Sequence, residues 1–172
     1  MGYSQTELEA VQARWDLRFP PDLVELLQEH RPLPVPGSDR SFDWLLSDPS
    51  VIQGVLDWPF DSFWFDVEHA GDWWPEWGKK PSIRAEQRHR LREVFAEAPR
   101  LIPLFGHRYI PQEPSESGNP VFSVYQMDVI CYGTDLKDWI ERERDGWSAK
   151  PWRPIKEIRF WSEAMRKNNA EP

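Results

Sequence analysis

The stretch VFSVYQMDVICYG, residues 121–133, constrains the fold of this chain more than any other feature. Two short runs rich in β-branched and aromatic residues flank a break near residues 126–128, which is the pattern of a β-hairpin. The apolar run LIPLF at 101–105 predicts a further strand, whose proline suits a sheet edge or a strand end. A polar loop at 111–120 separates the two regions. These segments predict strands in the second half of the chain.

Helical patterns lie on both sides of these strands. Apolar residues recur at helical spacing after a capping box at Ser4 and Glu7, and again after a proline-rich start at 20–22. A charged surface helix is predicted over about 82–98, a helix capped by Thr134 follows the hairpin, and IRFWSEAM near the end is helical too. The order predicts an α+β fold with an antiparallel central sheet, N-terminal helices, a long middle helix and C-terminal helices. The length fits one domain, residues 1–172.

The segment from Ser41 to Gly78 carries the whole charge imbalance of the chain. The protein has 21 Lys and Arg against 29 Asp and Glu, a net charge of −8. This segment has no Lys or Arg, and the rest of the chain carries 21 charges of each sign. The acids of the segment are Asp43, Asp48, Asp57, Asp61, Asp66, Glu68, Asp72 and Glu76. Such a surface argues against nucleic acid and anionic membranes as partners, and it suits a net basic protein.

The local structure of this acidic segment is predicted in two parts. Asp48 and Pro49 start a brief helix over DPSVIQGVL. The stretch FWFDVE at 63–68 then alternates in polarity as a strand does.

The octapeptide GDWWPEWG at 71–78 ends the acidic segment with three tryptophans. Burial of one tryptophan removes on the order of 200 Å² from water, so the core claims most such residues. Trp73 and Trp74 are adjacent, however, and point to opposite sides if the backbone is extended. We therefore expect at least one of the three to be exposed beside Asp72 and Glu76. An aromatic patch with an acidic rim is the composition that protein interfaces favour.

Motifs for catalysis and cofactor binding do not occur in the sequence. There is no glycine-rich phosphate loop, no CxxC pair and no HExxH, and the four histidines are far apart. Glu68, His69, Asp72 and Glu76 could be imagined around one ion, but an acidic loop with one histidine is more often a solvated surface. We therefore predict no metal site, no cofactor and no enzymatic activity.

His107 and Cys131 are the remaining candidates for chemistry. His107 could serve as a general base beside Tyr109 or Asp128, but we expect it to hydrogen-bond loop backbone instead. Cys131 lies in the apolar run VICY, which predicts a small core residue. A lone cysteine, the lack of a signal-peptide layout and the absence of a long apolar run predict a cytoplasmic protein without a transmembrane segment.

Several motifs in order resemble the SUKH superfamily, which joins bacterial toxin-immunity proteins to yeast regulators of cell-wall synthesis. They are PPDLVELLQEHRP, DWPFDSFWFDVEHAGDWWPEWG, LIPLFGHRYIP and GNPVFSVYQMDVICYG, and the resemblance covers about residues 20–161. It implies an α+β domain without catalytic residues that acts by binding. In many bacterial members of the family the bound partner is a toxin. Members that meet different toxins use different surfaces, so the resemblance assigns no contact residues.

The composition and the resemblance together predict a non-catalytic immunity protein that neutralises a net basic toxin, such as a nuclease. The predicted contact residues are Asp66, Glu68, Asp72, Trp73, Trp74, Glu76 and Trp77, with Glu113 and Glu116 on a second candidate edge. One alternative is an intracellular interaction scaffold of the cell-wall-regulator type. Others are a carbohydrate-binding module that uses planar tryptophans and a hydrolase that uses paired carboxylates.

Overall fold

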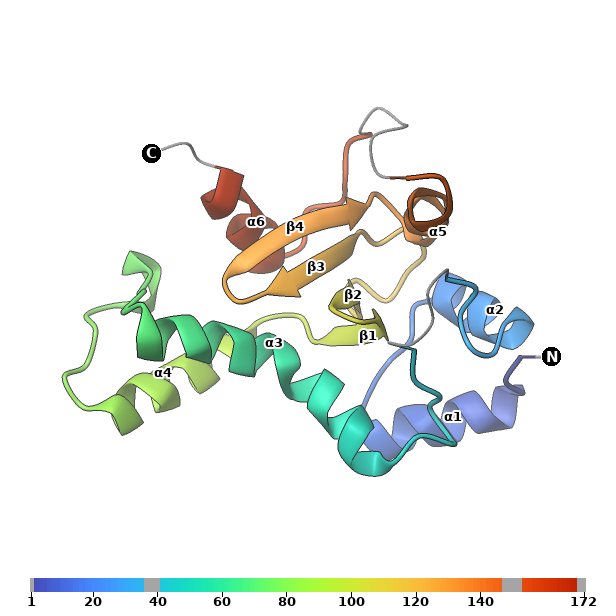
Figure 1. Ribbon diagram of the computed structural model, residues 1–172, viewed down its shortest axis with the longest axis horizontal. Coiled ribbons are helices and arrows are strands. Elements are labelled where there is room, and N and C mark those ends of the chain that lie inside the picture. Colours follow the sequence, from blue (N-terminus) through green and yellow to red (C-terminus); the bar gives the residue numbers. More distant parts are fainter. Residues whose placement is uncertain (1, 36–40, 147–152, 170–172) are drawn as a thin grey trace.

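The computed structural model describes residues 2–35, 41–146 and 153–169 and confirms the predicted α+β fold (Figure 1). A four-stranded antiparallel sheet has the order β1-β2-β3-β4. Its strands are β1 (Leu101–Phe105), β2 (Arg108–Pro111), β3 (Val121–Tyr125) and β4 (Asp128–Gly133). The helices are α1 (Gln5–Trp15), α2 (Pro21–Glu29), α3 (Pro49–His69), α4 (Arg84–Glu97), α5 (Leu136–Asp145) and α6 (Trp161–Asn169), and Pro75–Trp77 form the short 3-10 helix η2.

The hairpin and the edge strand lie where the sequence predicts them. β3 and β4 pair antiparallel around a turn at Gln126 and Met127. Pro103 lies in β1, at the edge of the sheet, where a missing N–H costs no ladder bond to a further strand. The sequence does not predict β2, because RYIP is too short to show an alternation of apolar and polar residues. Its pairing with β1 and β3 identifies it as a strand.

Residues 63–68 are helical, so the predicted strand FWFDVE is wrong. The brief helix that Asp48 caps continues to His69, and these six residues form its last turns. Phe63 and Val67 are buried at a spacing of four residues, whereas Phe65 between them is exposed. Six residues are too few to distinguish this helical pattern from the alternation of a strand.

The helix starts agree closely with the sequence. Ser4 and Glu7 form the predicted capping box of α1, and Asp48 accepts a hydrogen bond from the backbone of Ser50 at the start of α3. The cap of α5 differs by one residue. Asp135, not Thr134, accepts from the first turn, because its carboxylate reaches the backbone N–H of Asp138 at 2.7 Å.

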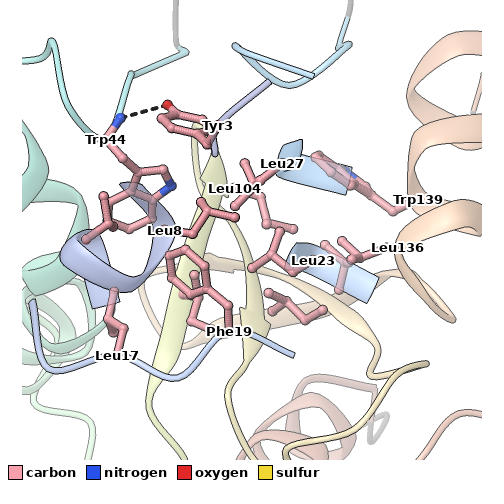
Figure 2. Close-up of a cluster of buried hydrophobic side chains, with 14 of the residues drawn as sticks. Tyr3, Leu8, Leu17, Phe19, Leu23, Leu27, Trp44, Leu104, Leu136 and Trp139 are labelled. Atoms are coloured by element: carbon pink, nitrogen blue, oxygen red, sulfur yellow. Dashed lines mark hydrogen bonds between the residues drawn. The ribbon is translucent and has the colours of Figure 1, made fainter. Parts of the chain in front are cut away.

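Two hydrophobic clusters cover opposite faces of the sheet, because successive side chains of a strand point to opposite sides. The first cluster joins α1, α2 and α5 to Ile102, Leu104 and Ile110 (Figure 2). In it, the hydroxyl of Tyr3 accepts a hydrogen bond of 3.0 Å from the backbone of Trp44. The second cluster joins the C-terminal half of α3, α4 and α6 to the other face; its strand residues are Leu101, Tyr109, Phe122, Val124 and Val129.

α3 runs beneath the sheet with a proline in its interior (Figure 1). Pro59 has no N–H, so the helix lacks the bond that would end on the carbonyl of Val55, four residues earlier. The hydroxyl of Tyr109, from β2, donates to this carbonyl at 2.8 Å. Burial raises the pKa of Tyr109 far above its usual value, which keeps the hydroxyl protonated as a donor. The sheet therefore supplies the hydrogen bond that the proline removes.

Further hydrogen bonds fasten the same side of α3 to β3 and its turn. The indole N–H of Trp58 donates to the carbonyl of Val124 at 2.9 Å. Ser62 accepts from the backbone of Gln126, and the carboxylate of Asp66 accepts from the backbone of Met127 at 2.8 Å. Asp66, predicted as a partner contact, thus supports the turn of the hairpin.

Replacement of Tyr109 by Phe should lower the free energy of unfolding by about 1–3 kcal/mol, because the Val55 carbonyl loses its partner. In a Pro59→Ala background the same change should cost less, because the helix regains its own N–H donor at residue 59. Urea unfolding of the four members of this double-mutant cycle measures the difference. Equal costs in both backgrounds would show that the tyrosine does not compensate for the proline.

Candidate functional site

The octapeptide GDWWPEWG packs over the second cluster. Trp77 is 4% exposed, and Trp73 and Trp74 are half-buried. The ring of Trp74 lies 4.8 Å from that of Trp77 and 5.5 Å from that of Phe63, measured between centroids. The expectation that one of the three tryptophans is exposed is not met, because these rings pack against one another in tilted and edge-to-face contacts. These residues therefore pack against the core instead of forming an exposed patch.

Most of the acids predicted as contacts have partners within the chain. Glu68 pairs with Arg84 at the start of α4. Glu76 pairs with Lys167 of α6 at 2.7 Å, and the hydrogen bond from this lysine lowers the pKa of Glu76. These pairs tie the end of the acidic segment to the helices beside it.

The remaining predicted acids are dispersed. Glu116 pairs with Lys156 at 2.8 Å, and the exposed Glu113 lines a separate hollow together with Asp57 and Asp61. Asp72 is exposed at the tip of the octapeptide. The structure does not gather the predicted contact residues into one surface, and their binding of a partner stays a prediction.

Replacement of Trp77 by Ala should lower the free energy of unfolding by about 3–5 kcal/mol, because it removes a buried ring from the second cluster. Asp72→Asn, in the same octapeptide, should stay within about 0.5 kcal/mol of wild type because its side chain is exposed. Thermal and urea unfolding check both. A Trp77→Ala protein as stable as wild type would contradict the structural role given to the octapeptide.

The outer side of α3 presents apolar side chains to solvent. Among the described residues, the large hydrophobic side chains that stay exposed are Leu45, Leu46, Val51, Trp58, Phe65, Ile83 and Tyr125. All but the last two belong to the acidic segment 41–78. The segment therefore does carry an exposed apolar surface, but on α3 and the residues before it instead of on the octapeptide.

A groove of about 470 Å³ lies at the centre of this surface, and we call it the α3 groove. One wall is the face of α3 with Val51, Gly54, Val55 and Trp58. The other wall is Tyr125 at the end of β3, with His107 from the turn between β1 and β2. Trp58 and Tyr125 are 39% and 53% exposed, and their ring centroids are 6.0 Å apart. The groove volume is within the range of about 300–1,000 Å³ that is usual for ligand pockets.

Two carboxylates lie beside the α3 groove. Asp48 accepts a hydrogen bond of 2.6 Å from the hydroxyl of Ser50, which lines the groove. Asp128 is the pairing partner of Tyr125 across the hairpin. Both acids are exposed, and α3 contains no Lys or Arg. An apolar centre with a charged rim of one sign is the anatomy of a protein-binding surface.

The sequence pattern contains a signal for this groove. Val51, Val55 and Trp58 are four and three residues apart, which is the spacing of one helix face. The helix predicted over DPSVIQGVL ends before Trp58, so the prediction did not place these three residues on one helix face. Tyr125 could not be assigned to the same site, because only the tertiary fold brings β3 beside α3.

The side chains that were candidates for metal binding or catalysis make structural contacts. Among residues 2–35, 41–146 and 153–169, no three His, Cys, Asp or Glu side chains are grouped so that they could hold a metal ion. The ring of His107 lies 5.8 Å from that of Tyr125. The hydroxyl of Tyr109 donates to the Val55 carbonyl, so this proton is already engaged.

Cys131 should be unreactive in the native protein at pH 8. Burial raises the pKa of its thiol to about 11, so roughly one thiol in a thousand is ionised at that pH. A thiol-specific reagent should modify the urea-unfolded chain rapidly and the native chain slowly. The native rate should rise with pH toward 11, and rapid modification at pH 8 would contradict burial of this thiol.

No family model matches the chain, and neither a curated protein nor a solved structure is significantly similar to it. Within the part of the chain that the structure describes, no helix has both the length and the apolar character that a bilayer crossing requires.

Proposed function

We propose that this protein is a non-catalytic immunity protein, which binds and neutralises a net basic bacterial toxin through the α3 groove and its acidic rim. One observation carries the proposal: exposed aromatic rings line an apolar groove on a helix without a single basic residue. The resemblance of the sequence to the SUKH superfamily supports the same mode of action, which is binding without catalysis.

The chemistry of the surface favours a protein over a small molecule. Binding hot spots are enriched in tryptophan and tyrosine that sit in a pocket within a rim of weaker contacts. Trp58 and Tyr125 have this arrangement. The rim carboxylates steer a basic partner during diffusion and disfavour an acidic one, so charge sets the choice of partner and the apolar centre sets how long it stays.

The predicted contact residues have different roles in this proposal. Asp66, Glu68 and Glu76 position the hairpin turn, α4 and α6 through their internal contacts. Asp72 and Glu113 are exposed and lie outside the groove lining, so the proposal assigns them no contact. The tryptophans of the octapeptide support the core beneath them.

Replacement of Tyr125 by Ala should weaken toxin binding by about 2 kcal/mol, or roughly 30-fold, and should leave the melting temperature almost unchanged. The matched control is Ile83→Ala, because Ile83 is a similarly exposed hydrophobic residue, 55% exposed, at the start of α4 and outside the groove. Affinity capture from a lysate of the source organism supplies the partner, and calorimetry with the purified partner measures the dissociation constant.

The same purified partner tests the role of charge. It should be net basic, and stopped-flow mixing should show an association rate that falls as salt rises, because charges beyond about 10 Å are screened at 0.1 M. Dissociation should change less. A tight acidic partner, an association rate indifferent to salt, or equal binding by the Tyr125→Ala and Ile83→Ala proteins would contradict the proposal.

A further inference from the structure

Gly54 occupies a position where a glycine is unfavourable and nothing nearby requires one. It lies in the interior of α3, where glycine is the poorest helix former after proline. A Cβ atom built at this position meets no atom within 4 Å. By contrast, a Cβ at Gly133 would come within 2.5 Å of the Cβ of Trp139, and one at Gly2 within 2.2 Å of the carbonyl oxygen of Gln28. Packing explains those two glycines, but it does not explain Gly54.

The space beside Gly54 is the α3 groove itself. Val51 precedes Gly54 by one helical turn, Trp58 follows it by one turn, and all three line the groove. A side chain at residue 54 would extend into the volume of about 470 Å³ between α3 and Tyr125. The missing side chain therefore keeps this groove open.

Three polar groups of the groove-lining side chains already have partners. The hydroxyl of Tyr109 donates to the Val55 carbonyl at 2.8 Å, and the indole N–H of Trp58 donates to the Val124 carbonyl at 2.9 Å. The hydroxyl of Ser50 donates to Asp48 at 2.6 Å. A polar group that entered the groove would lose its water without gaining these hydrogen bonds, whereas an apolar group loses nothing.

On the basis of the proposed function, we propose that the α3 groove receives one apolar side chain from a Lys- and Arg-rich segment of the partner protein. Gly54 is then a specificity-determining residue, because it leaves room for that side chain. The flanking basic residues of the partner face Asp48 and Asp128, which adjoin the groove through Ser50 and Tyr125, respectively.

Substitutions at Gly54 change the groove without destabilising the fold. Gly54→Leu should occupy the part of the groove between Val51 and Trp58, and Gln53→Leu is its matched control, because Gln53 is the exposed neighbour on the same helix and does not line the groove. Gly54→Ala should raise the melting temperature by about 2–4 °C through better helix propensity. Gly54→Leu should fold at least as stably as wild type, since its Cβ meets open space.

Three acetylated and amidated pentapeptides serve as probes: Lys-Lys-Leu-Lys-Lys, Lys-Lys-Ala-Lys-Lys and Glu-Glu-Leu-Glu-Glu. NMR titration of the wild-type protein should show shifts of the Trp58 indole and Tyr125 amide signals with the first peptide. The alanine peptide should bind at least five-fold more weakly, and the glutamate peptide should not bind up to 10 mM. Gly54→Leu should weaken binding of the first peptide at least ten-fold, and Gln53→Leu should leave it unchanged.

The outcomes distinguish this inference from the proposed function. Equal binding of the leucine and alanine peptides, or no shift at Trp58 up to 10 mM, would overturn the inference. So would a captured partner that binds Gly54→Leu as tightly as wild type while Tyr125→Ala weakens it, and in that case the proposed function stands. If Tyr125→Ala also leaves partner binding unchanged, the proposed binding surface is wrong as well.

Discussion

A proline inside α3 and a tyrosine from the sheet determine how this protein is assembled. Pro59 leaves the carbonyl of Val55 without its helical donor, and the hydroxyl of Tyr109 takes that place. A partly buried carbonyl without a partner is costly, so the helix docks favourably where the tyrosine reaches it. Together with the hydrogen bonds of Trp58, Ser62 and Asp66 to β3 and its turn, this contact fixes the position and the rotation of α3. The exposure of Gly54 and Val51, and hence the groove, follows from these contacts.

Local signals in the sequence predict the parts of the fold that depend on local physics. The capping box at Ser4, the hairpin at 121–133 and the edge position of Pro103 each depend on a few neighbouring residues, and each is found in the structure. The strand prediction for residues 63–68 is wrong because six residues of mixed polarity fit both the two-residue period of a strand and the 3.6-residue period of a helix. Only the preceding cap at Asp48 and the contacts of the whole helix decide between them.

The candidate site was harder to predict because it depends on pairing in three dimensions. The count of acids points to the segment 41–78, and among the described residues that segment carries most of the exposed large hydrophobic side chains. A count cannot show that Glu68 meets Arg84 or that Glu76 meets Lys167, however, since the lysine is 91 residues away. Nor can it show that Tyr125 joins Trp58 from another element. The composition of the octapeptide predicts a binding surface, but its tryptophan rings pack in the core.

α3 is also the element that connects the two hydrophobic clusters. Its first half contributes Ile52 to the cluster with α1 and α2, and its second half contributes Phe63 and Val67 to the cluster on the other face of the sheet. Pro59 lies between these halves, directly after Trp58 of the groove. A molecule bound in the groove would contact both the first half of α3 and Tyr109 of the second cluster, so separation of this part of α3 from the sheet would require its release. Occupation of a small surface site would thereby slow hydrogen exchange where α3 packs on the sheet.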